Sequence, residues 1–183
     1  MMDFIQPLLP PQSGETLVSW IARFANVKLG MSIGQFSKFF AVNKQDIHMG
    51  SSSELEKMSQ LSGVAVEHLE EHTIKSCGNR LHRFSGQLFS REFIAGQRIK
   101  YCPKCLLEDL SDYSNCRNLP VGRLLWVFSP VRVCYKHCTP LVYEKCEKRY
   151  LSYMDLTRHV SSGDKLLGKT QTAESREVSG LQT

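Results

Sequence analysis

The chain has 183 residues, of which 42% are apolar and 22% are charged, and its formal net charge is +5 at pH 7. This balance is typical of a globular protein of one medium or two small domains, and it excludes wholesale disorder. No apolar run reaches the length of about 18 residues that a membrane-spanning helix needs, and the first residues lack the basic flank of a secretory signal, so we expect a cytoplasmic protein.

The first predicted element is an amphipathic helix from Thr16 to Leu29. Residues 7–11 (PLLPP) favour an extended lead-in because proline disfavours helix, and Ser13 is a candidate N-cap. Gly30 is a suitable terminator. The apolar positions recur at intervals of three and four and so form one stripe: Leu17, Trp20, Ile21, Phe24 and Val27.

Three shorter helices are predicted next. Ser32 can cap a helix that carries Ile33 and Phe36, whereas residues 43–53 are polar and predict a loop. A third helix contains the sequence ELEKMSQL, and a fourth runs from about Ala65 to Ile74.

The last two of these helices form a predicted helix–turn–helix shape. The turn is tight because Gly63 can supply a positive φ, and the pattern from Leu55 to Leu69 packs the two helices together. Small helical bundles without a DNA function give the same pattern. The second helix carries Glu67, Glu70 and Glu71, which a row of phosphates would repel, so we expect it to contact protein rather than a DNA groove.

Charge is divided unevenly along the middle of the chain. Residues 44–74 hold two basic and six acidic side chains, whereas residues 75–104 hold seven basic and one acidic. These blocks are either solvated faces or surfaces for two different partners. The basic block alternates with aromatic residues, as nucleic-acid contact requires, although the aromatics could equally form core. The candidate contact residues are Arg80, Arg83, Arg91, Arg98 and Lys100.

Two cysteine-containing pairs predict a metal site. Cys102 and Cys105 form a C-x-x-C, and Cys134 and His137 form a C-x-x-H after a spacing typical of a zinc ribbon. Four protein ligands would complete a tetrahedron around Zn²⁺, so the site is expected to be structural rather than catalytic. The alternatives are free thiols in a small core or a redox C-x-x-C, and the second pair argues against both. Chelation is expected to unfold residues 100–146 and to leave the first seventy helical.

The other cysteines lie outside these two pairs. Cys138 could replace His137 as the fourth ligand, and Cys146 with His159 offers a weaker second site. Cys77 and Cys116 have no partner at ligand spacing and are predicted to be small buried residues.

Three segments together resemble the TniQ family of transposition proteins. They are GETLVSWIARFA with the preceding Pro7, YCPKCLLED, and RLLWVFSPVRVCYKHCTPL followed by Cys146. The family pattern reads P-x-x-x-E-S-L-x-S-W-x-x-R-x-A, then C-P-x-C-L-x-E-D, R-x-x-W and V-x-V-C-x-x-H-x-x-P-L. The resemblance covers about residues 5–146 and gives the zinc-ligand role to Cys102, Cys105, Cys134 and His137.

The resemblance implies a mainly α protein, with a helical helix-turn-helix-like module followed by a small zinc-ribbon or zinc-finger module. We expect the modules at 1–75 and 101–160, a basic-aromatic connecting segment at 76–100 and a disordered tail at 161–183. Two departures stand out. A second C-x-x-C that many relatives have is broken at Cys146, and Cys138 occupies a position where the family usually has glycine.

The resemblance also implies a function. The chain would be a non-enzymatic bacterial adaptor or target selector of a Tn7-like transposon, in some relatives a CRISPR-associated one with an RNA-guided effector. It would connect a target complex or target DNA to an AAA+ ATPase regulator of the TnsC or TniB type. The short chain favours a compact adaptor over autonomous DNA reading. The alternatives are a stand-alone DNA-binding regulator and, less favoured because the ligand set is filled, a zinc hydrolase or redox enzyme.

Overall fold

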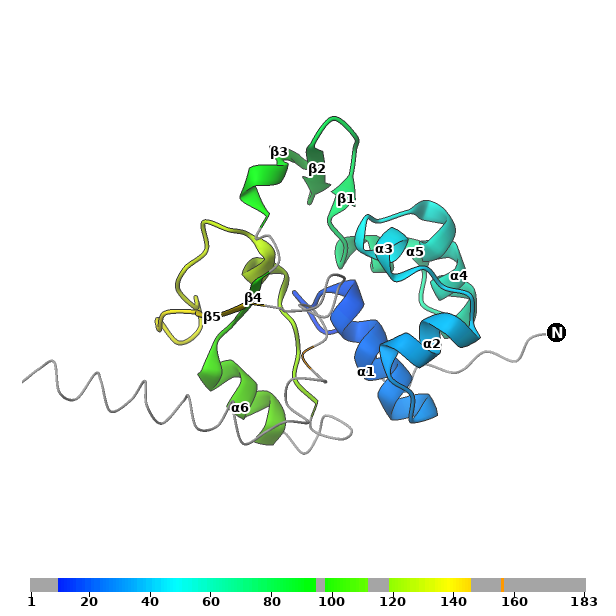
Figure 1. Cartoon of the computed structure of the whole chain (residues 1–183), viewed down its shortest axis with the longest axis horizontal. Coiled ribbons are helices and arrows are strands. Elements are labelled where there is room, and N and C mark those ends of the chain that lie inside the picture. Colours follow the sequence, from blue (N-terminus) through cyan, green and yellow to red (C-terminus); the bar gives the residue numbers. More distant parts are fainter. Residues whose placement is uncertain (1–9, 95–97, 112–118, 146–155, 157–183) are drawn as a thin grey trace, which may run out of the picture.

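The computed structural model describes residues 10–94, 98–111, 119–145 and 156. Over these residues the protein is rich in helix and has two small sheets (Figure 1). Helices α2–α5 lie on one side of α1, and α6 with β4 and β5 lies on the other. The elements are α1 (Leu17–Leu29), α2 (Ile33–Phe39), α3 (Lys44–His48), α4 (Ser52–Ser62), α5 (Val66–Glu71), β1 (Lys75–Ser76), β2 (Leu81–Phe84), β3 (Gln87–Ser90), η1 (Arg91–Phe93), β4 (Arg98–Tyr101), α6 (Pro103–Ser111), η2 (Leu124–Val127) and β5 (Val142–Lys145).

The central helix α1 confirms the first sequence prediction except at its cap. Thr16, not Ser13, is the N-cap, and its hydroxyl accepts a hydrogen bond from the Ser19 backbone N–H at 3.2 Å. Ser13 lies one turn too early, because Gly14 at φ 72° first redirects the chain. At the other end Gly30 adopts φ 64° and closes the helix as expected.

The predicted loop at residues 43–53 contains helix α3, so that prediction was wrong. The Asn43 side chain caps this helix by accepting from the backbone N–H of Gln45 at 2.9 Å, and Ile47 is its buried apolar anchor with an exposed fraction of 1%. A five-residue helix with one buried apolar residue is too short to produce a helical period in the sequence. Helix α2, by contrast, has the expected Ser32 cap, completed by Gln35 as a capping box.

Helices α4 and α5 are joined by the predicted tight turn. Gly63 ends α4 with φ 71°, and the two helices pack against each other. Helix α5 is shorter than predicted and ends at Glu71, because His72 and Thr73 turn the chain back across α1. There the carbonyl of His72 accepts from the Leu17 N–H at 2.8 Å.

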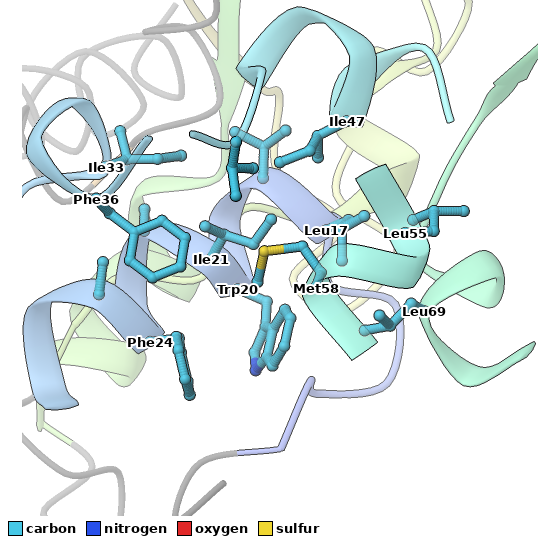
Figure 2. Packing of buried hydrophobic residues seen from close by; sticks show 14 of the residues in the cluster. Leu17, Trp20, Ile21, Phe24, Ile33, Phe36, Ile47, Leu55, Met58 and Leu69 are labelled. Carbon is cyan, nitrogen blue, oxygen red and sulfur yellow. The ribbon is translucent and has the colours of Figure 1, made fainter. Parts of the chain in front are cut away.

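The helical core is formed around α1. Trp20, Ile21 and Phe24 are fully buried, and Figure 2 shows them facing side chains from α2, α3, α4 and α5. The edge of the Phe36 ring meets Phe24, with ring centroids 6.1 Å apart. The one apolar stripe that the sequence predicts on α1 is therefore the contact that assembles the other helices.

Residues 75–90 form a three-stranded antiparallel sheet in the order β1-β2-β3, in a region that was expected to be a connecting segment. Ser85 and Gly86 close the β2–β3 hairpin at φ 47° and 76°, the two positive values that a tight two-residue turn requires. Phe84 and Phe89 pack against Phe128, with centroid distances of 5.8 and 5.2 Å. Part of the aromatic content of this segment is therefore core.

The segment that carries the predicted metal ligands is interlocked with the helices around α1. Strand β4 pairs with β5, with Tyr101 opposite Val142, and the segment after α6 returns to α1. There the Thr16 N–H donates to the Gly122 carbonyl at 2.8 Å, and the Leu124 N–H donates to Gly14 at 2.7 Å. Side chains of η2 enter the helical core, so the two parts share buried surface.

No helix in the described part of the chain is long and apolar enough to cross a membrane. The predicted tail at 161–183 lies outside the described residues.

Candidate metal centre

The four predicted ligands come from two tight turns. Cys102 follows β4 directly, and Cys105 lies in the first turn of α6, which begins at Pro103, a residue well suited to that position. In the second turn the Cys138 N–H donates to the Cys134 carbonyl at 2.8 Å, which folds the chain so that His137 faces back toward Cys134. The three cysteines are at most 1% exposed, and the His137 side chain is 15% exposed.

The ligand atoms of these four residues all lie within 4.8 Å of one another. The Nδ1 of His137 is 3.5, 3.3 and 3.7 Å from the Sγ atoms of Cys102, Cys105 and Cys134, and the last two sulfurs are 3.6 Å apart. Bonds of about 2.3 Å to sulfur and about 2.0 Å to nitrogen give a tetrahedron with edges of about 3.5–3.8 Å. These separations therefore fit a four-coordinate ion, and three sulfurs with one imidazole suit zinc.

Glu108 on α6 holds the imidazole of His137 in place. Its Oε1 lies 3.1 Å from His137 Nε2, and its Oε2 accepts from Lys136 Nζ at 2.6 Å. A carboxylate can only accept, so Nε2 carries the proton and Nδ1 is left free to face the sulfurs. The hydrogen bond from Lys136 also lowers the pKa of Glu108, which keeps this carboxylate ionised.

The thiols have unequal electrostatic surroundings. Burial would raise the pKa of Cys102, but hydrogen bonds to its sulfur, the strongest from the Thr139 hydroxyl, lower it to about 7. Burial raises the pKa of Cys105, against the opposing charge of Arg123. A cation that binds here would meet one thiol that ionises more readily than a free cysteine and one that ionises less readily.

An ion pair next to the centre connects α6 to the segment that returns to α1. Arg123 binds Asp109 through two hydrogen bonds of 2.7 and 2.9 Å, and Asp109 also accepts the Val121 N–H at 3.0 Å. The Asp109 side chain is 9% exposed, and the Arg123 guanidinium lies 4.9 Å from the ring of Trp126. This pair therefore sets the position of η2, whose Trp126 packs beside the cysteines.

A second buried ion pair lies at the start of α1. Glu15 and Arg23 are both fully buried and form two contacts of 2.8 Å. The Ser19 hydroxyl donates to Glu15 at 2.9 Å and accepts from the Gly122 N–H at 2.8 Å. The charges of the pair are thus compensated by each other and by hydrogen bonds, as burial requires. Through Ser19 the pair also holds the returning segment on α1.

Sequence reasoning did not identify the roles of Glu108, Asp109, Arg123, Glu15 and Arg23. Two signals were available: two acidic residues follow the C-x-x-C after a pair of leucines in YCPKCLLED, and Glu15 and Arg23 lie about two helical turns apart. Glu15 and Arg23 pair with each other across eight residues, but Asp109 and Glu108 pair with Arg123 and His137, which are 14 and 29 positions away, so those two pairings could not be read from the sequence.

The structure also decides where several other predicted residues lie. Cys138 is exposed and outside the cluster, so the cluster contains His137 and not its neighbour. Cys77 is exposed, which corrects the prediction that it is buried: it follows the edge strand β1 in a turn. Cys116, Cys146 and His159 lie outside the described residues.

The five candidate contact residues do not share one environment. Arg83 and Arg91 are exposed on the hairpin and η1, and Arg80 is exposed and paired with Glu92 at 2.8 Å. Arg98 lies in β4. Lys100 is only 5% exposed, and its ammonium donates to the carbonyls of Phe128 and Val131, so it is engaged in the fold and not available at the surface.

Comparison with protein families matches residues 7–141 to the TniQ family. A comparison with curated proteins finds no match.

Proposed function

The chain belongs to the TniQ family, and from this premise we propose that it is a non-enzymatic adaptor in Tn7-like transposition. In this role it links a target complex, or target DNA, to an AAA+ ATPase regulator of the TnsC or TniB type. The single observation that carries the proposal is the family match, which spans residues 7–141 and so includes the helical core, the hairpin and the cysteine cluster.

The proposed cofactor is one structural Zn²⁺ held by Cys102, Cys105, Cys134 and His137. The separations among the ligand atoms support it, and four such ligands would fill a tetrahedron and leave no position for a reacting water. The nearby carboxylate of Glu108 is occupied by His137 and Lys136 and so is not placed as a general base. When bound, the ion would cross-link three parts of the chain, namely the end of β4, helix α6 and the second turn. Its role would be structural and not catalytic.

Two surfaces of opposite charge support an adaptor with two partners. Glu67 and Glu71 are exposed on α5, whereas Arg83 and Arg91 are exposed on the hairpin and η1. We assign the acidic surface to a protein partner, because carboxylates on α5 would repel phosphates, and the basic surface to the target side. The helix-turn-helix shape of α4 and α5 is then a protein-docking element, not a groove reader.

The proposal is tested by capture of purified AAA+ regulators on the zinc-loaded protein. Glu67→Lys with Glu71→Lys should abolish capture, whereas Arg83→Glu with Arg91→Glu should leave it intact and weaken binding of the target complex or DNA. Lys38→Glu on α2 is the matched control for a change of surface charge. Cys134→Ala should lose both activities through loss of the fold. Failure of the wild-type protein to capture any regulator, together with specific and salt-dependent duplex binding, would favour the stand-alone DNA-binding regulator.

A further inference from the structure

The second turn of the metal centre exposes an aromatic ring among positive charges. Tyr135 is 71% exposed and Val133 is 51% exposed, although both flank the fully buried Cys134. The charged residues of this turn, Arg132 and Lys136, are both basic and exposed. The Tyr135 ring therefore exposes apolar surface that takes no part in the packing of the protein.

The neighbouring charges make this surface positive. Lys104, from the first turn, is exposed, and Lys136 is paired with Glu108, the acidic residue of α6 that remains at the surface. Asp109 is withdrawn into its pair with Arg123. The result is a tip with two exposed cations, Lys104 from the first turn and Arg132 from the second, and the exposed ring of Tyr135 in the second turn.

The tip is continuous with the hairpin surface. The Ser129 N–H donates to the Phe93 carbonyl at 2.7 Å, and the Ser129 hydroxyl donates to the Glu92 carbonyl at 2.8 Å, so η1 and the loop before Arg132 are joined. Figure 1 shows this yellow loop beside β4 and β5, on the side of the molecule away from α2–α5. The exposed Arg91 of η1 and the exposed Arg132 therefore lie on two segments that are hydrogen-bonded to each other.

We propose that this tip, with Tyr135 at its centre, binds an unpaired nucleic-acid strand. A ring on a convex loop can stack only on a base with an open face, and a duplex offers such faces only at its ends. The flanking cations supply the phosphate contacts that a strand needs. An acidic peptide would satisfy the charges but would give the exposed ring no flat partner. The inference adds a contact to the proposed function and does not depend on the ATPase link.

The test uses the full-length, zinc-loaded protein and fluorescent oligonucleotides of one sequence as single-stranded DNA, single-stranded RNA and duplex. The length is about 20 nucleotides, longer than the roughly 4–16 that one such module covers. We expect a single strand to bind more tightly than the duplex. Tyr135→Ala should weaken that binding about tenfold, the loss of one stacked base, and Tyr135→Phe should retain it. Arg132→Ala should reduce the salt dependence by about one phosphate contact.

Phe39→Ala is the matched control, because Phe39 is also 71% exposed but lies on α2. Zinc content must stay at the wild-type level in every variant. Equal binding of duplex and single strands, no binding of any strand, or an equal loss in Phe39→Ala and Tyr135→Ala would overturn the inference. Capture of the AAA+ regulator is measured on the same Tyr135→Ala sample, so loss of the strand contact is distinguished from failure of the adaptor function.

Discussion

At the scale of single residues, the positions that carry the family resemblance either lie in the core or hold another residue in place. Glu15, Ser19, Trp20 and Arg23, the polar and aromatic positions of the opening pattern, are each at most 2% exposed. In the segment YCPKCLLED the final two residues hold His137 and Arg123. These residues hold other residues of the fold in place, so their substitution is expected to act through folding and metal binding.

Glu108 provides the sharpest test at this scale. Replacing it with alanine removes the acceptor of His137 Nε2, so the imidazole is no longer oriented, and zinc affinity should fall about 10- to 100-fold. Glu108→Gln keeps an acceptor without the charge and should lose less. Competition with a chromophoric chelator measures the affinity. Lys136→Ala is the control: it removes an exposed ion pair, which contributes little to stability, and an equal loss of zinc affinity in this variant would contradict the orienting role of Glu108.

Cys138 is held in a conformation that favours glycine. Its φ is 52°, in the left-handed region, where a side chain costs about 1–2 kcal/mol. Cys138→Gly should raise the free energy of unfolding by about 0.5–1 kcal/mol after the greater chain entropy of glycine is subtracted. Urea unfolding at saturating zinc measures this change. Cys138→Ala removes the thiol but keeps the Cβ, so a gain of the same size in the alanine variant would assign the effect to the thiol.

At the scale of elements, α1, α2, α4 and α5 were predictable from apolar spacing and turn or cap residues, whereas α3 and the β1–β3 sheet were not. Helix α1 has an apolar residue every three or four positions over 13 residues, and this local signal placed it correctly. Helix α3 depends on a single side-chain cap. The β1–β3 sheet depends on a two-residue turn and on packing partners that are distant in the chain, such as Phe128. The two metal-ligand pairs were visible because spacing within each pair is local; the residues that orient them were not, because they come from 28 or more positions away.

The contact between α3 and the hairpin predicts sensitivity to acid. Burial, and secondarily the nearby His82, lowers the pKa of His48 from 6.5 to about 4. The folded state therefore resists protonation, so stability is full above pH 6.5 and declines as the pH falls toward 4. From pH 7.5 to 5.5 this group should cost about 1 kcal/mol.

Urea unfolding of the wild type and His48→Gln at both pH values, with zinc saturating, isolates this cost. Glutamine stays neutral, so the variant should lose about 1 kcal/mol less than the wild type between the two conditions. The carboxylates and the metal ligands are common to both proteins and cancel in the difference. Equal losses in the two proteins would show that His48 is protonated as readily in the folded state as in the unfolded state.

At the scale of the whole molecule, the metal centre and the helical core are coupled. Leu124 and Val127 belong to the helical core, whereas Trp126, between them in the chain, packs with the cysteines. The same segment is tied to α1 by Gly122 and to α6 by the pair of Arg123 with Asp109. Removing the ion should therefore do more than unfold residues 100–146, as the sequence alone suggested, because the start of α1 loses its partner as well.

The two tryptophans allow this coupling to be measured separately in each part. Trp20 reports the helical core and Trp126 reports the metal centre. In Trp126→Phe, where Trp20 is the remaining fluorophore, EDTA should lower the thermal midpoint by several degrees, since each lost kcal/mol shifts a chain of this size by about 2–4 °C. At low temperature the far-UV helix signal should largely persist. In Trp20→Phe, EDTA alone should shift the emission of Trp126 to the red. A Trp20 midpoint that does not respond to EDTA would mean that the two parts fold independently, and the coupling through η2 would then have to be abandoned.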